Sequence, residues 1–184
     1  MKQFGQLFLL MTLLLTQTAC GVLLGNIKPV DERSDSYGVA DLTKQSPDWT
    51  RMRRSSGPAA DANGTGLSDV AFQSKKTGAV ISLNSACRAT TQTKEEPLKE
   101  LMNQLLLGIN DVSFRADQDI EVQGIPALDT TIQGKMNSEN VMLRSVVLRK
   151  NRCVYDLMYI ARPETFAEYQ ETFSQFVASL RLKE

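Results

Sequence analysis

Two neighbouring strands are predicted by residues 141–160, which read VMLRSVVLRKNRCVYDLMYI. Apolar and β-branched residues fill both halves of this stretch, 141–148 and 153–160. The basic segment 149–152 between the halves has the length of a turn. We therefore expect a β-hairpin here, the longest in the chain, at the centre of a sheet.

Further strands are predicted on both sides of this hairpin. Alternating or apolar runs lie at 37–42, 70–72, 79–83 with a continuation to 87, 112–114, 120–122 and 128–132. Turn-forming residues separate them at 75–78, 123–126 and 136–140. Small residues and turn formers dominate 53–68, which is expected to be a mobile surface loop. Trp49 is expected to fill the core.

Two helices are predicted from apolar side chains that recur at helical spacing. The first stripe consists of Leu98, Leu101, Met102, Leu105 and Ile109, and the second of Phe166, Tyr169, Phe173, Phe176, Val177 and Leu180. Such stripes are typical of helices that cover a sheet. The expected fold is a single α+β domain over 36–184, with a curved, mainly antiparallel sheet of about six strands flanked by helices.

The first 19 residues have the pattern of a secretory signal peptide. Lys2 supplies a positive start, and the apolar run 7–15 is far shorter than the roughly 20 residues that span a bilayer. Without these 19 of its 184 residues the chain keeps 165, enough for one domain. The segment 20–35 that follows is expected to be a flexible tether.

The end of this leader, Gln17-Thr18-Ala19-Cys20, resembles the lipobox of bacterial lipoproteins. The resemblance implies that Cys20 becomes the acylated first residue of the mature protein, anchored by its acyl chains to a membrane. Gln17 stands where the usual motif has Leu, and the alternative is ordinary secretion with an unmodified Cys20. Gly21 rather than Asp after Cys20 implies a periplasm-facing protein of the outer membrane more than of the inner one.

Composition argues against several common classes of enzyme. The chain has no His, which removes the usual general base and the usual transition-metal ligand. It also lacks G-x-S-x-G, S-x-x-K, C-x-x-C and phosphate-binding glycine motifs. We therefore expect no catalytic residues, no metal and no cofactor.

The charges are balanced, with 21 basic and 21 acidic residues. This balance gives no support for binding nucleic acid or an anionic membrane. The short basic segments 51–54 and 149–152 are expected to be solvated loop faces.

Cys87 and Cys153 form an even pair in a chain that is expected to be exported. An oxidising envelope favours a disulfide between them. By closing a long loop, this bond would stabilise the fold by roughly 4 kcal/mol in the chain-entropy model. Two free buried thiols are the alternative. Cys87 shares its strand parity with Ile81 and Leu83, so its side chain is expected on their face.

Two groups of carboxylates are candidates for chemistry. Asp117, Asp119 and Glu121 alternate and could offer oxygen ligands to calcium, but they lack EF-hand spacing and are expected to form a solvated strand face. Asp129 and Asp156 lie within apolar strands, where Arg144 is a possible partner. Structural pairing of these groups is favoured over catalysis.

The order of elements resembles the PsbP-like fold, which is shared by lumenal PsbP proteins of photosystems and the Ran-binding Mog proteins. The resemblance is carried by Trp49, the hairpin from 69–72 to 78–82, the run 153–163 and the helix 173–182. It covers most of 36–184 and is nearer still to uncharacterised proteobacterial lipoproteins of this fold. It implies an α/β/α sandwich and an envelope location, but no functional residue.

These observations favour a lipid-anchored, non-enzymatic module that binds or assembles a membrane-associated protein complex. The expected partners are the membrane, through the lipid on Cys20, and an envelope protein. A periplasmic carrier of a small apolar ligand is one alternative. A carboxylate or metal-dependent enzyme is the other.

Overall fold

The computed structural model describes residues 28–29, 37–52, 69–87 and 96–182 of the chain. The predicted signal peptide, Cys20, the predicted mobile loop 53–68 and most of the predicted tether lie outside the described residues. Within the described ranges, no helix is long and apolar enough to cross a membrane.

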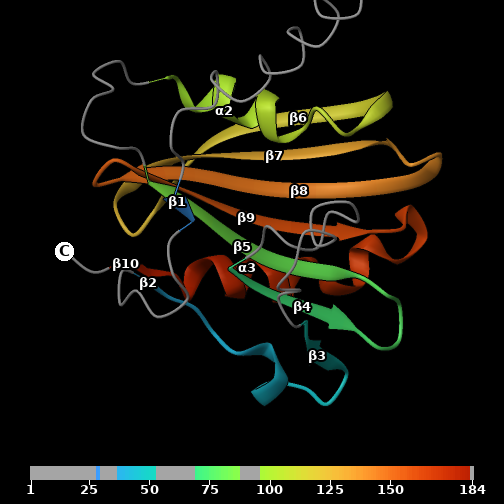
Figure 1. Ribbon diagram of the computed structural model, residues 1–184. Helices are drawn as coiled ribbons and strands as arrows, with labels where there is room; N and C mark the ends of the chain where they lie inside the picture. The colour runs from blue at the N-terminus through green and yellow to red at the C-terminus, as the bar shows by residue number, and fades with distance from the viewer. Residues whose placement is uncertain (1–27, 30–36, 53–68, 88–95, 183–184) are drawn as a thin grey trace, which may run out of the picture.

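The fold is built on one large antiparallel sheet (Figure 1). Its strands are β1 (Lys28–Pro29), β3 (Trp49–Arg51), β4 (Val70–Ser74), β5 (Val80–Cys87), β6 (Asn110–Val122), β7 (Ile125–Met136), β8 (Glu139–Lys150) and β9 (Cys153–Ala161). Seven of them follow the order β3-β4-β5-β9-β8-β7-β6, and β1 pairs with β5 outside this order. The predicted α+β class is confirmed, with more strands than the six or so expected.

The elements outside this sheet are short. β2 (Tyr37–Gly38) pairs with β10 (Arg181–Leu182) in a second, two-stranded sheet, so the strand expected at 37–42 is reduced to its first two residues. Three residues later the chain enters η1 (Leu42–Lys44), a single 3-10 turn that buries Leu42 completely. The two-residue strands were not predicted, since alternation cannot be detected over two residues.

Tight turns join the strands from β6 to β9. Each connection has two central residues, both with positive φ: Gln123 and Gly124, Asn137 and Ser138, Asn151 and Arg152. Positive φ at both positions is the pattern of type I′ turns, whose twist matches that of paired strands. The result is a four-stranded meander with strands of 13, 12, 12 and 9 residues.

The predicted hairpin of β8 and β9 lies at the centre of the sheet, as expected. It is not the longest, because β6 and β7 are paired along 13 and 12 residues. The sequence concealed this longer hairpin because the middle of β6 is charged: Arg115, Asp117 and Asp119 interrupt any apolar alternation. An edge strand tolerates such residues, since it has little to bury.

Helices cover both faces of the sheet and give the predicted α/β/α sandwich. On one face, α2 (Leu98–Leu105) packs Met102 against Leu143 and Val147 of β8 and their neighbours. On the other, η3 (Pro163–Tyr169) and α3 (Gln170–Ala178) pack Phe166, Phe173 and Phe176 on a larger core. Alternate residues of β8 therefore serve separate cores.

The structure confirms the second predicted apolar stripe fully and the first only in part. All six apolar residues expected at 166–180 pack in the larger core. In the first helix Leu105, expected to face the sheet, is 38% exposed, and Leu106 is buried instead. The reason is that α2 ends at Leu105, and a turn places Leu106 four residues after Met102 on the covered side.

Gly134 in β7 allows the chain to cross closely above the sheet. A Cβ built at this position would lie 2.6 Å from the carbonyl oxygen of Asn110 and 2.7 Å from Cγ2 of Ile109. These contacts come from the segment where β6 begins and where its register with β7 shifts between Asn110 and Phe114. A glycine at this point therefore sets the start of the edge strand.

Gly134→Ala should destabilise the fold by about 2 kcal/mol, because backbone rather than a flexible side chain must move. Urea unfolding would measure the change. Gly108→Ala is the matched control, since its Cβ would meet nothing within 4 Å and should cost little. Equal effects of the two substitutions would contradict the close crossing at Gly134.

Candidate functional site

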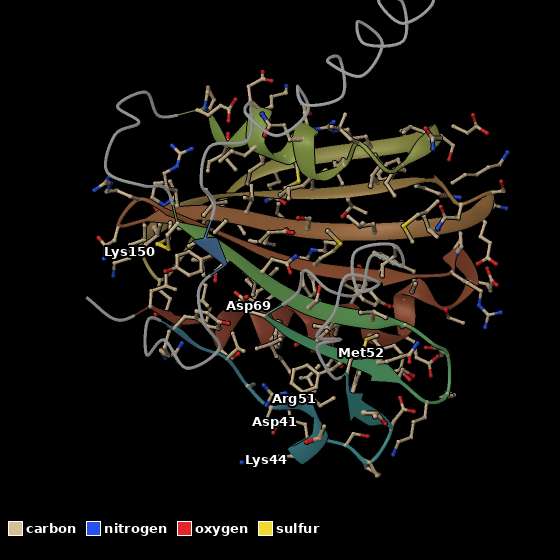
Figure 2. All side chains as sticks on the ribbon, in the orientation of Figure 1. Asp41, Lys44, Arg51, Met52, Asp69 and Lys150 are labelled. Atoms are coloured by element: carbon tan, nitrogen blue, oxygen red, sulfur yellow. A yellow bond between two sulfur atoms is a disulfide. The ribbon has the colours of Figure 1, made fainter. Side chains whose placement is uncertain are left out.

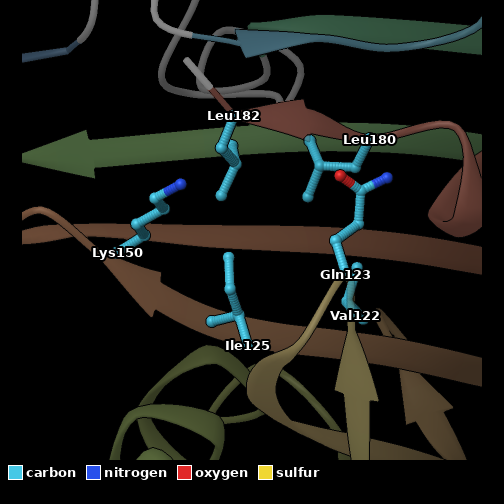
Figure 3. Close-up of a pocket in the computed structure, with 6 residues that line it drawn as sticks. All are labelled: Val122, Gln123, Ile125, Lys150, Leu180 and Leu182. Atoms are coloured by element: carbon cyan, nitrogen blue, oxygen red, sulfur yellow. The ribbon is translucent and has the colours of Figure 1, made fainter. Parts of the chain in front are cut away.

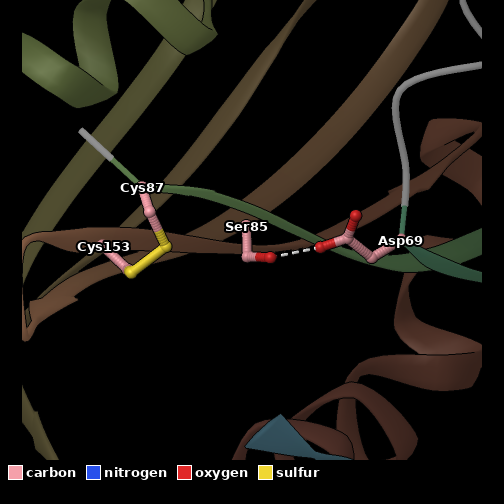
Figure 4. The surroundings of a disulfide bond; sticks show 4 residues. All are labelled: Asp69, Ser85, Cys87 and Cys153. Carbon is pink, nitrogen blue, oxygen red and sulfur yellow. Dashed lines mark hydrogen bonds between the residues drawn. A yellow bond between two sulfur atoms is a disulfide. The ribbon is translucent and has the colours of Figure 1, made fainter. Parts of the chain in front are cut away.

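The structure joins Cys87 and Cys153 in a disulfide with an S–S distance of 1.97 Å (Figure 4). The two residues are direct partners at one end of the β5–β9 pair. Cys153 packs against the larger core, on the face of Ile81 and Leu83, as the parity of the strand predicted. Near the disulfide, the buried carboxylate of Asp69 accepts a hydrogen bond from the Ser85 hydroxyl.

Replacing both cysteines by Ser should lower the free energy of unfolding by about 4 kcal/mol, because the link closes a loop across a separation of 66 residues. Urea unfolding of the variant and of the oxidised parent would measure the loss. The single variant Cys87→Ser should match the double variant. A double variant as stable as the parent would show that the link does not constrain the unfolded chain.

Arg144 and Asp129 form the predicted ion pair, on the face covered by α3. Arg144 donates to both carboxylate oxygens of Asp129, at 2.7 to 3.1 Å, and to Oγ of Ser174 at 3.0 Å. Its guanidinium also lies 5.4 Å from the ring centre of Phe173. These hydrogen bonds link α3 to the sheet. Because the carboxylate and the guanidinium are each bonded to the other, neither is available as a general acid or base.

Asp156 is on the opposite face, so Arg144 cannot serve it. The Asp156 carboxyl accepts from Oγ of Ser145 at 2.6 Å and from the amide of Asn84 at 3.4 Å. Burial raises its pKa above the ordinary value of 3.8, against the lowering effect of these hydrogen bonds. The two interior carboxylates are thus separated by the sheet, and one of them favours its neutral form.

Asp156→Asn should make stability less dependent on pH. Asp156 binds its proton more tightly in the folded protein than in the unfolded chain, where its pKa is about 3.8. The free energy of unfolding therefore falls as the pH rises from 3.8 toward the folded pKa. Asn keeps the shape of the neutral acid and removes that loss of stability. Urea midpoints between pH 4 and 8 would measure the slope.

Asp129→Asn is the control for that experiment, because it breaks the ion pair with Arg144 on the other face. It should lose about 2 kcal/mol at pH 7. A loss of the same size in Asp156→Asn at pH 7 would mean that Asp156 is ionised in the folded protein.

A further polar cluster, which the sequence did not single out, binds three segments together. Tyr169 donates to Oδ2 of Asp48 at 2.7 Å, and Ser74 donates to the same oxygen at 2.8 Å. The Tyr169 hydrogen bond is the main reason that the pKa of Asp48 is lowered. Trp49 packs edge-on against Tyr169 at 5.0 Å and is buried, as predicted. The cluster fixes η3 to the hairpin of β4 and β5.

The predicted acidic face, Asp117 to Glu121, lies on the outermost strand. Asp117 is held by Arg115 at 2.9 Å and by Thr130 at 2.8 Å. Asp119 and Glu121 have no ion-pair or hydrogen-bond partner among the described residues, and both are exposed. Across the described ranges, the structure groups no three His, Cys, Asp or Glu residues in a way that could hold a metal ion.

Exposed apolar side chains lie on both faces of the sheet near the start of the same strand. In the described part of the chain, the large hydrophobic residues that are exposed are Leu105 (38%), Leu107 (79%), Val112 (50%), Phe114 (47%) and Met136 (37%). Phe114 shares the face of Ile120 and Val122, in the larger core, whereas Met136 shares the face of Ile132, which α2 covers. We call the five exposed residues the β6 patch.

The β6 patch is the candidate functional site. Single exposed apolar residues are common, but five large ones around one sheet edge offer apolar surface that a protein partner could cover. The sequence showed Val112 and Phe114 as strand residues, with the alternation of a half-buried strand. Their exposure follows from the position of β6 at the edge, which alternation does not reveal.

Two surface clefts are small. One, of about 50 Å³, is lined by Val122, Gln123, Ile125, Lys150, Leu180 and Leu182 (Figure 3). The other, of about 160 Å³, lies between the segment 37–41 and Arg51, Val70 and Phe72. Sites for drug-sized ligands usually measure about 300 to 1,000 Å³, so neither cleft supports a carrier.

Comparison with known proteins finds likeness in structure alone. No family model and no curated protein match the sequence. The solution structure of cyanobacterial PsbP (CyanoP) from Synechocystis sp. PCC 6803 has a TM-score of 0.53 at 10% identity, over 89% of this chain and 96% of that one. The chain has the PsbP-like fold.

A second structure of this fold is LpqN of Mycobacterium tuberculosis, described as involved in cell envelope biogenesis. Its TM-score is 0.56 at 10% identity, over 85% of this chain and 90% of that one. At this identity the likeness concerns the fold, and function must come from the residues of the site.

Proposed function

We propose that this chain is a lipid-anchored, non-enzymatic protein of the bacterial cell envelope that docks a protein partner through the β6 patch. The observation that carries the proposal is that the exposed large apolar residues of the described chain all come from the end of α2, the start of β6 and the end of β7, on the two faces of one sheet edge. The leader and Cys20 support the envelope and the anchor. The printed description of LpqN agrees with an envelope location.

The position of the patch favours a protein as its occupant. Leu107, Val112 and Phe114 are each about half exposed or more, so a partner could cover their apolar surface without any rearrangement of the core. Asp119 and Glu121 lie further along the same strand, toward the turn at 123–124, and carry negative charge that is not neutralised within the described chain. A partner segment that follows this edge with apolar residues first and basic residues after them would complement both features.

Charges along β6 also disfavour edge-to-edge pairing of two copies. Asp117, Asp119 and Glu121 alternate along it, and a register shift breaks its regular geometry between Asn110 and Phe114. Natural edge strands use charges and bulges in this way to avoid aggregation. The β6 patch is therefore proposed to bind a different protein rather than a second copy.

The arrangement of the carboxylates supports a non-enzymatic role. Asp129 is neutralised by Arg144, and Asp156 lies on the other side of the sheet with Ser145 and Asn84. They do not converge on a cleft where a general acid and a base could act together.

A photo-crosslinking side chain at Leu107 should give a discrete product with an envelope protein in cells. Val112→Ser with Phe114→Ser should reduce that product at least tenfold, since loss of central apolar contacts typically costs more than 1 kcal/mol of binding. Immunoblots of irradiated cells would measure it.

Two controls make that experiment specific. Ala116→Ser changes an exposed residue of the same strand and should leave the product intact. The crosslinker placed at Glu171, exposed on α3, should give no such product. An equal yield from the double variant, or no product at Leu107, would contradict docking at the β6 patch. Thermal unfolding would confirm that the variants are folded.

A further inference from the structure

We infer that the end of the sheet formed by the turns at 123–124 and 151–152 faces the membrane and binds anionic phospholipid headgroups. This inference rests on the proposed lipid anchor at Cys20, which would hold this end near the membrane. It adds to the proposed function an orientation of the domain on the membrane and, besides the protein partner, a lipid ligand. The sequence analysis expected the basic segment 149–152 to be a solvated loop face. The structure shows what surrounds that segment.

The anchor and this end of the sheet are close along the chain. β1 pairs Lys28 with Cys87, and Cys87 in turn is opposite Cys153, next to the β8–β9 turn. Lys28 follows Cys20 by eight residues, which can span at most about 28 Å when fully extended. An acylated Cys20 therefore keeps this end near the bilayer.

Cations at this end lack anionic partners. Lys150 precedes the β8–β9 turn and is half-buried, and Arg152 lies in the turn and is exposed. Neither side chain has an ion-pair or hydrogen-bond partner among the described residues. Arg181 is also here, since β10 follows Leu180 at the rim of the cleft beside Lys150, and it donates to backbone carbonyls. Figure 2 shows Lys150 at the end of the strands where Figure 1 labels β1.

Most cations at the opposite end are paired. Lys76 is paired with Glu168, Lys135 with Asp111, and Arg162 with Glu164. Lys75 is the exception among the described residues there, and it donates to the backbone carbonyl of Pro47. The strand β8 separates the two ends by 12 residues, or about 37 Å. The end that the anchor holds thus has three cations, Lys150, Arg152 and Arg181, without an anionic partner in the described chain, against the one unpaired carboxylate of Glu121.

The cleft of about 50 Å³ at this end has room only for a water-sized group, so a headgroup would rest on its rim, where Lys150 lies. In Figure 3 the ammonium of Lys150 lies at the edge of the hollow that Leu180 and Leu182 line. A cation above apolar side chains suits a phosphodiester that is attached to a hydrocarbon chain. This chemistry favours a phospholipid over a free anion.

Charge reversal tests the inference on the acylated full chain in vesicles of 30% phosphatidylglycerol and 70% phosphatidylcholine. A fluorescent residue at Asn151, exposed in the turn and outside the cleft, should be quenched by nitroxide-labelled headgroups, and one at Ser138, in the opposite turn, should not be. Lys150→Glu with Arg152→Glu should reduce quenching at position 151 at least threefold. Lys44→Glu with Lys99→Glu, two exposed cations elsewhere, should not. Equal quenching at both positions would overturn the orientation.

A second arm separates this inference from the anchor. Palmitate labelling of the parent chain and of Cys20→Ala decides whether Cys20 is acylated, and its failure would overturn the anchor. Sedimentation of full-length Cys20→Ala with the same vesicles decides headgroup binding alone. Each cation near an anionic surface strengthens binding about fivefold, so reversal of Lys150 and Arg152 should weaken it at least 25-fold. Equal binding to pure phosphatidylcholine vesicles, or no effect of the reversal, would overturn headgroup binding.

Discussion

The pairing of β5 with β9 is the contact on which the rest of the fold depends. It joins the β3–β5 segment to the β6–β9 meander through eight residue pairs, from Val80 with Ile160 to Cys87 with Cys153. Without it the sheet would be two separate pieces, each with an uncovered apolar face. With it, Ile81 and Leu83 lie beside Tyr159 and Leu157 and form one apolar face of the sheet, which η3 and α3 cover.

Much of this apolar face of the sheet could be predicted from the sequence. Alternation identified β4, β5, β8 and β9, and the aromatic stripe from Phe166 to Leu180 identified the covering helix. The parity of Cys87 predicted the face of its side chain. These features are local, and they are repeated over enough residues for period 2 and period 3.6 to be distinguished.

Other features depended on neighbours that the sequence does not identify. Val112 and Phe114 alternate like core residues, yet they are exposed because no strand or helix of the described ranges covers the start of β6. Asp129 and Asp156 looked equivalent, but strand register placed Arg144 on the face of Asp129 alone. Leu105 and Leu106 exchanged roles because the helix ended a turn early. In each case tertiary position overrode a local pattern.

The late position of β9 has a consequence for synthesis. A ribosome completes β5 long before its partner, since Cys153 follows Cys87 by 66 residues. At 5 to 20 residues per second, that interval lasts about 3 to 13 seconds. Throughout it, one edge of β5 with its apolar residues has no native partner. A chain that is exported must in any case stay unfolded until it has crossed the membrane, and the late position of β9 fits that requirement, because the two halves of the sheet cannot join before nearly all of the chain has been made.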